Sequence, residues 1–318
     1  MSEHITHIAV GEDSYRVASQ RPDFSLRMRA AITAHPDAFR LGTCTRSGDT
    51  FILPLLTEWQ TDWTGSDAQQ RQLSYVTGWM GHLAGDRTFK PVFRITDLAF
   101  YTRGYPGPAH ASVYHDAATF AAVFDHGREA PFHPTILSAD LSAHPAASFL
   151  PVSDLEPALA VQFAGALAGF KTFLPERVDD WEAQWEAIND ERQRFYVEVD
   201  RYTAAYQQPD PARTRQYLID PKFYDPDDPI IRLARAVQRE EEPPVSLDEA
   251  LQGTEEQSLY AQSLKLGYDF LTACSDYLEG RIDLEQAKRD TRQFQAHKES
   301  LEYYIKLAES QSESASGN

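Results

Sequence analysis

Apolar residues recur at helical spacing through much of the first 175 residues. Between Leu155 and Phe170 they are separated by four, four, four and three positions, and between Phe24 and Ala34 they also fall on one side of a helix. Spacings of three and four bring side chains to one helical face, whereas a half-buried strand alternates every two residues. Further helices are predicted over residues 13–21, from about residue 50, from Ser66, and over residues 109–125. The chain is therefore predicted to be all-α.

Prolines and glycines predict where these helices end. The helix that starts at Phe24 should end at His35, because the residue before a proline avoids the helical conformation. By the same rule, the long helix that starts at Ser66 should end close to Pro91. Residues 41–49 and 94–108 contain glycine, and the second segment also contains proline, so we expect both to be loops.

The chain changes character after Pro175. Long helices with dense charge are predicted over residues 178–206 and 254–307. Residues 207–244, between them, are rich in Pro and Asp, which predicts a connector with short helices. The predicted parts are a helical bundle domain, a helical extension and a disordered polar tail, at residues 1–175, 176–309 and 310–318.

Composition and charge narrow the functions that the chain could have. It has 318 residues, of which 42% are hydrophobic, and this is enough apolar material for a sizeable core. A formal net charge of -18 opposes general binding to nucleic acid or to anionic membranes, because both require a basic patch. No apolar run reaches membrane-spanning length, and no basic segment followed by an apolar one lies near the start. We therefore expect a cytoplasmic protein without stable membrane insertion.

The two cysteines and the charged second half add two further expectations. Cys44 and Cys274 are far apart and lack a paired spacing, which favours two unrelated core thiols over a disulfide or a thiolate zinc site. The charge runs of the second half are typical of solvated helix faces. An amphipathic half of this kind could also pair with a partner or with a second copy of the chain, so a homo-oligomer stays open.

The stretch Gly78–Pro91 contains the first candidate chemistry. His82 and Asp86 stand four apart in an apolar run of small residues, so a helix would project both from one face. Such a pair is commonly a hydrogen-bonded core or surface pair. Glycines at 78, 81 and 85 would let another backbone approach, and a buried carboxylate needs a partner, which a cation could provide.

The remaining candidate side chains each have two interpretations. His7 lies beside the amino end and could be solvated or functional. Asp49 could cap the helix that follows it, the commonest role of an aspartate there, or it could bind metal. His115 lies near the start of a predicted helix, a position along the bundle that suits a site formed between helices.

Three motifs together resemble those of the zinc-dependent phospholipase C family. They are Thr6-His7, Leu41-Gly42 followed by Asp49, and the Gly-x-x-x-His-x-x-x-Asp of residues 78–86. They occur in the family's order, and the resemblance covers about residues 1–170. It implies an all-α bundle with a metal site between helices.

The resemblance also implies a chemistry. Zinc favours imidazole and carboxylate ligands and lowers the pKa of a bound water to about 7. Asp49 is implied either as a ligand or as the base that orients the attacking water. The metal ligands implied are His7, Asp49, His82, Asp86 and, as a later ligand, His115. We therefore expect a zinc-dependent hydrolase of a small phosphodiester or phospholipid-like, lipid-derived substrate.

Two departures from the family pattern give an alternative. Lys90 stands before Pro91 where the family usually has a histidine, and Thr119 stands four after His115 where it usually has a glutamate. These changes should remove most of one metal position. Lys90 could neutralise a phosphate, or it could be a solvated surface lysine. The alternative is a catalytically inactive helical binding or scaffold protein that keeps the fold and at most a structural metal.

Overall fold

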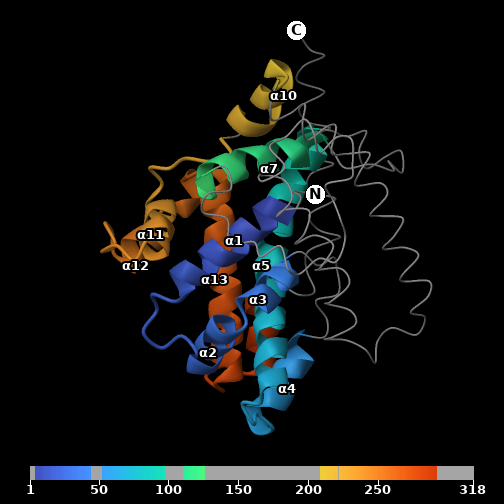
Figure 1. Ribbon diagram of the computed structural model, residues 1–318, viewed down its shortest axis with the longest axis vertical. Coiled ribbons are helices and arrows are strands. Elements are labelled where there is room, and N and C mark those ends of the chain that lie inside the picture. Colours follow the sequence, from blue (N-terminus) through green and yellow to red (C-terminus); the bar gives the residue numbers. More distant parts are fainter. Residues whose placement is uncertain (1–3, 44–51, 97–109, 126–207, 221, 292–318) are drawn as a thin grey trace, which may run out of the picture.

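The computed structural model describes residues 4–43, 52–96, 110–125, 208–220 and 222–291 (Figure 1). Within these ranges the chain forms helices and no strand, so the all-α prediction is confirmed. No helix in the described ranges is both long and apolar enough to cross a membrane. The predicted domain boundary after residue 175, the helical pattern between residues 155 and 170, the helix predicted over residues 178–206, and the tail lie outside the described residues.

Three long helices form the centre of the molecule: α1 (His4–Ala18), α5 (Asp67–Thr96) and α13 (Leu259–Leu278). Each packs against the other two, and Figure 1 shows α5 and α13 side by side along the long axis with α1 lying across them. Trp79 and Phe270 are among the large side chains in the shared core. Burying one side chain of this kind contributes about 1.5–3 kcal/mol. Helix α13, although distant in sequence, is therefore part of the same core as α1 and α5.

Helices α1 and α5 touch through two glycines. A Cβ atom added at Gly81 would lie 2.7 Å from the Cα of Gly11, closer than real Cβ contacts allow. The two backbones can approach this closely only because neither residue has a side chain. The glycines of α5 therefore mark a helix crossing.

Helices α2 (Leu26–Ala34), α3 (Pro36–Thr43) and α4 (Ile52–Thr61) pack on the central helices. The predicted end of α2 at His35 is confirmed, and Ser25 caps its start by accepting a hydrogen bond from the Met28 N–H. The loop predicted over residues 41–49 is wrong for its first residues, because α3 continues to Thr43. A Cβ at Gly42 would lie 2.1 Å from the Tyr75 carbonyl oxygen, so this glycine serves a close helix contact.

Two other predicted helix boundaries differ from the structure. The helix predicted over residues 13–21 begins earlier, at His4, because Asp116 caps its first turn. Helix α5 continues through Pro91 to Thr96, although its end was predicted near the proline. A proline inside a helix removes one backbone hydrogen bond, and the packing of α5 on α1, α3 and α13 compensates for that local cost.

The carboxy-terminal part consists of short helices around α13. The connector contains α10 (Pro211–Thr214), the π-helix η8 (Arg215–Ile219) and α11 (Pro229–Gln238), as predicted for a segment rich in Pro and Asp. The single helix predicted over residues 254–307 is wrong in its described part. It consists of η9 (Thr254–Glu256), α13 and α14 (Leu284–Asp290), with α12 (Leu247–Leu251) just before them. Gly280, with a φ of 68°, provides the turn after α13.

Helix α7 (His110–Val123) confirms the helix predicted over residues 109–125 and packs on α1 and η8. Its Asp116 accepts hydrogen bonds from the backbone N–H groups of Ile5 (3.1 Å) and Thr6 (2.9 Å). The carboxylate satisfies donors that the first turn of α1 would otherwise leave open, and it interacts favourably with the positive end of the helix dipole. Helix α1 is thereby fixed at the end that carries His7.

Candidate metal centre

His7 from α1 and His82 and Asp86 from α5 form one buried cluster. Each offers a ligand atom, and these three atoms lie within 4.8 Å of one another. The exposed fractions of the three residues are 2%, 3% and 7%. The four-residue spacing of His82 and Asp86 places both on the face of α5 that α1 covers, as the sequence pattern predicted.

The His82 ring is held in an orientation that leaves one nitrogen for a ligand. Its Nδ1 lies 3.0 Å from the Thr43 carbonyl oxygen. Because a carbonyl oxygen only accepts, Nδ1 carries the proton, and in the neutral ring Nε2 then has the free lone pair. Nε2 lies 3.4 Å from Asp86 Oδ2, but it makes no well-formed hydrogen bond with any residue that the structure describes. A backbone carbonyl that orients the far side of an imidazole in this way is typical of metal-binding histidines.

His7 is positioned by the absence of a side chain at Gly85. A Cβ at Gly85 would lie 2.6 Å from His7 Nδ1, which is too close for any atom of this kind. The His7 and His82 rings lie side by side, with centroids 4.3 Å apart and planes at 32°. Gly85 therefore makes room for one imidazole directly beside the other.

Asp86 faces several positive or potentially positive groups. Its Oδ1 lies 3.6 Å from His7 Nε2, and its Oδ2 forms an ion pair with Lys90. Burial by itself would raise the pKa of the Asp86 carboxyl, but its interactions with the neighbouring His82 and His7 rings and with the Lys90 ammonium hold this pKa well below its usual range. Oδ1 accepts no hydrogen bond from the described residues. The carboxylate is thus ionised, and one oxygen is available to a cation.

The donor set and its spacing fit a transition metal. Two imidazole nitrogens and one carboxylate oxygen are the ligand types that zinc prefers, and three protein ligands are typical of sites that keep a position for water or substrate. Ligand atoms bound about 2.1 Å from a tetrahedral ion are about 3.4 Å apart. His82 Nε2 lies 3.4 Å from Asp86 Oδ2 and His7 Nε2 lies 3.6 Å from Asp86 Oδ1, so each imidazole is near this spacing from one carboxylate oxygen, and one ligand atom from each residue can be chosen with all three within 4.8 Å.

The structure does not bring every predicted ligand to this cluster. Asp49 lies outside the described residues. His115 is fully buried on α7, where it stacks on Phe223 at 3.9 Å, and its Nε2 donates to the Tyr217 carbonyl oxygen at 3.0 Å. Burial lowers the pKa of His115 to about 3, so the ring is neutral. Among the described residues, the metal-ligand group contains His7, His82 and Asp86 and does not include His115.

The two residues that depart from the family pattern are both engaged. Lys90 pairs with Asp86 and keeps 20% of its side chain exposed. The Thr119 hydroxyl lies 3.2 Å from the Thr6 hydroxyl, next to the carboxylate that caps α1. Sequence reasoning missed the roles of Asp116 and of the Thr43 carbonyl. Asp116 is more than a hundred positions from the helix it caps, and a backbone acceptor has no residue-type signal at all.

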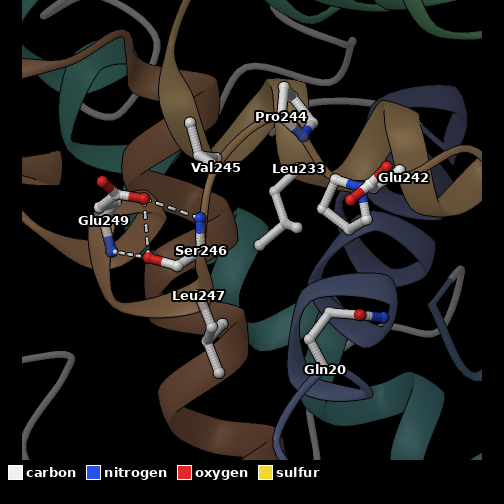
Figure 2. A pocket seen from close by; sticks show the side chains of 9 residues that line it. Gln20, Leu233, Glu242, Pro244, Val245, Ser246, Leu247 and Glu249 are labelled. Carbon is white, nitrogen blue, oxygen red and sulfur yellow. Dashed lines mark hydrogen bonds between the residues drawn. The ribbon is translucent and has the colours of Figure 1, made fainter.

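An open groove lies elsewhere on the molecule, beside the loop before α12 (Figure 2). Its volume is about 420 Å³, and Leu233, Pro244 and Val245 are among its apolar lining residues. Glu249 at its edge is engaged with Ser246 in a capping box that starts α12, as the dashed lines in Figure 2 show. The three cluster residues do not line this groove.

Comparison with known proteins identifies no relative: no family model, no curated protein and no solved structure matches this chain. What the protein does must therefore be inferred from its own side chains. The described residues provide one arrangement with recognisable metal-binding chemistry, the buried cluster of His7, His82 and Asp86.

Proposed function

We propose that the protein is a metal-dependent hydrolase that uses zinc to cleave a phosphodiester or phospholipid-like substrate. The observation that carries the proposal is the orientation of His82, whose Nδ1 is held by the Thr43 carbonyl so that Nε2 faces His7 and Asp86. A histidine that served only packing would have no need of a second imidazole and an ionised carboxylate within ligand distance. The motif resemblance to zinc-dependent phospholipases C supports the same chemistry.

His7, His82 and Asp86 would hold the ion. A zinc ion there would activate a water molecule at neutral pH and polarise a phosphoryl oxygen. The Thr43 carbonyl fixes the His82 tautomer, and Gly85 positions the His7 ring. Asp49 stays a predicted ligand or base, and His115 stays a predicted later ligand.

One observation favours a second function. Lys90 already pairs with the Asp86 carboxylate, so the cluster has part of its charge balanced by the chain itself. This arrangement suits a helical binding or scaffold protein that keeps the fold without catalysis. The two functions differ in whether the purified protein binds a transition metal and whether the loaded protein cleaves a phosphodiester.

Elemental analysis of the purified protein tests the proposal. We expect close to one zinc per chain after zinc loading and desalting, and hydrolysis of bis(p-nitrophenyl) phosphate by the loaded protein. The His82→Ala variant should lose both. His35→Ala is the matched control, because His35 pairs with Asp67 in the first turn of α5, about four turns before His82, and this variant should retain metal. A zinc-loaded wild type without phosphodiesterase activity would support the scaffold function, and failure to bind any transition metal would exclude the zinc enzyme.

A further inference from the structure

Lys90 occupies the carboxylate that a metal ion would need. Its ammonium group pairs with Asp86 Oδ2, and the side chain is one helical turn beyond Asp86 on the same face of α5. The carboxylate belongs to a residue only 7% exposed, so water screens this ion pair weakly. A divalent ion entering the cluster would therefore meet a cation already in place.

His82 differs from Asp86 in this respect. His82 Nε2 has no hydrogen bond from the described residues, and its tautomer already suits a ligand. The His82 imidazole therefore presents a nitrogen donor that makes no hydrogen bond to the described residues, whereas the Asp86 carboxylate shares its negative charge with the Lys90 ammonium. Imidazole binds zinc and similar transition metals strongly, while magnesium and calcium depend on oxygen ligands.

From this difference we propose that Lys90 is a built-in competitor for Asp86, which weakens binding of all divalent cations and excludes those that rely on carboxylate oxygen. This inference rests on the metal site of the proposed function and adds its regulation. Zinc binding would have to compete with the ammonium for the negative charge of Asp86, so that occupancy of the site follows the free zinc concentration. Magnesium and calcium would gain too little binding free energy from the two imidazoles to overcome the competition from the Lys90 ammonium.

Two substitutions of Lys90 separate its charge from its bulk. Lys90→Met removes the ammonium and keeps a long apolar side chain, whereas Lys90→Arg keeps the charge. Lys265→Met is the matched control, because Lys265 pairs with Asp269 at 2.7 Å on α13, also four residues apart. Circular dichroism should show the helical content of wild type in each variant.

The measurement is zinc affinity of the full chain by competition with a chromophoric chelator, with magnesium as the second probe and Co²⁺ absorption as a check of ligand geometry. We expect Lys90→Met to bind zinc about 10–100-fold more tightly than wild type, since one charge of like sign is removed from a weakly screened site. Lys90→Arg and Lys265→Met should stay within about threefold of wild type, the range expected of substitutions that leave the site's charge unchanged.

The outcomes distinguish this inference from the proposed function. Equal zinc affinity in wild type and Lys90→Met would overturn the competitor role and leave the metal enzyme intact. Zinc binding by Lys90→Met alone would support the competitor role and remove the wild-type zinc enzyme. Absence of zinc binding in both would overturn both proposals, and tight magnesium binding by wild type would overturn the exclusion of oxygen-dependent ions.

Discussion

Asp13 and Asp86 are two buried carboxylates in the same helical core, one on α1 and one on α5, and their surroundings differ. Asp13 Oδ1 accepts from Arg16 Nη1 at 2.5 Å and from Arg235, and its Oδ2 accepts from the Tyr260 hydroxyl at 2.8 Å. Asp86 has one lysine, two imidazoles nearby, and an oxygen that accepts no hydrogen bond from the described residues.

The difference separates a structural carboxylate from a candidate ligand. Guanidinium and phenol groups donate hydrogen bonds but do not coordinate metal ions at neutral pH, so both oxygens of Asp13 are satisfied by the protein itself. Imidazoles with oriented lone pairs can coordinate a metal, and a buried carboxylate left partly unsatisfied is costly unless something binds it. Equal burial therefore says little about function, and the chemistry of the neighbours decides.

The largest effect on the free energy of unfolding should come from breaking the hydrogen bonds of Asp13. Asp13→Ala would leave the charges of Arg16 and Arg235 buried without their shared carboxylate, and loss of one partner from a buried ion pair costs about 3–5 kcal/mol. Urea unfolding followed by circular dichroism measures this loss. For metal-free protein, Asp86→Ala should cost less, and a larger cost at Asp86 than at Asp13 would contradict the distinction.

His115, a buried histidine outside the cluster, should cause a loss of folding stability of similar size in acid. The pKa of His115 falls to about 3 in the fold, below its unfolded value near 6.5, so the unfolded chain takes up a proton that the folded chain refuses. The stability that depends on neutral His115 is fully present above about pH 6.5 and is lost as the pH falls toward 3, by about 1.4 kcal/mol per unit.

Chemical unfolding at several pH values between 5 and 6.5, with a chelator present, measures this slope. The His115→Gln variant keeps an amide donor for the Tyr217 carbonyl but cannot be protonated in this range. Its slope should be smaller than that of wild type, by an amount that rises to about 1.4 kcal/mol per pH unit at the acid end of this range. An unchanged slope would mean that His115 is not the group that takes up the proton.

Stabilisation of the fold by zinc should depend on the Asp86 carboxylate and not on the hydrogen bonds of Asp13. Zinc at a hundred times its dissociation constant should stabilise wild type by about 2.7 kcal/mol, because only the folded chain presents the assembled cluster. Asp86→Asn should lose this stabilisation, and Tyr260→Phe, which removes a donor to Asp13, should keep it. Thermal unfolding with and without zinc provides the comparison. Equal stabilisation by zinc in the two variants would contradict the role of Asp86 as a metal ligand.

A smaller change at Gly85 tests how sharply the cluster is positioned. Gly85→Ala would push the His7 ring, which lies 2.6 Å from the added Cβ, and residues that position metal ligands typically affect affinity by about 10–100-fold. Chelator competition measures the loss, and the Asp13 network should be unaffected in urea unfolding of the metal-free protein, apart from the local strain. Unchanged affinity would show that His7 is not a ligand.

Sequence reasoning was more successful within elements than between them. The spacing of His82 and Asp86 predicted their common face, because a helix fixes which side chains align over one turn. The partnership of Arg235 with Asp13 could not be predicted, since the two residues are 222 positions apart and a guanidinium can satisfy many carboxylates. The pairing of Lys90 with Asp86 follows from their spacing, but its meaning depends on the imidazoles that another helix contributes.

Predictions of helix boundaries from the sequence failed for a related reason. Pro91 and Gly42 were interpreted through their local conformational preferences, and both lie within helices of the structure. Gly42 is explained by the backbone of α5 that passes beside it, a contact absent from any local pattern. Only the assembled helices show which glycines end an element and which let one element approach another.

The contact of Gly11 with Gly81 has a further consequence. His7 lies one turn before Gly11 on α1, and Gly85 lies one turn after Gly81 on α5, so the place where the backbones touch is adjacent to the place where the ligands meet. Side-chain packing can relax after a substitution, but two backbones in contact have no intervening atoms to rearrange. The distance between the ligand-bearing turns is thus a property of the two main chains, and it should persist while surrounding side chains change.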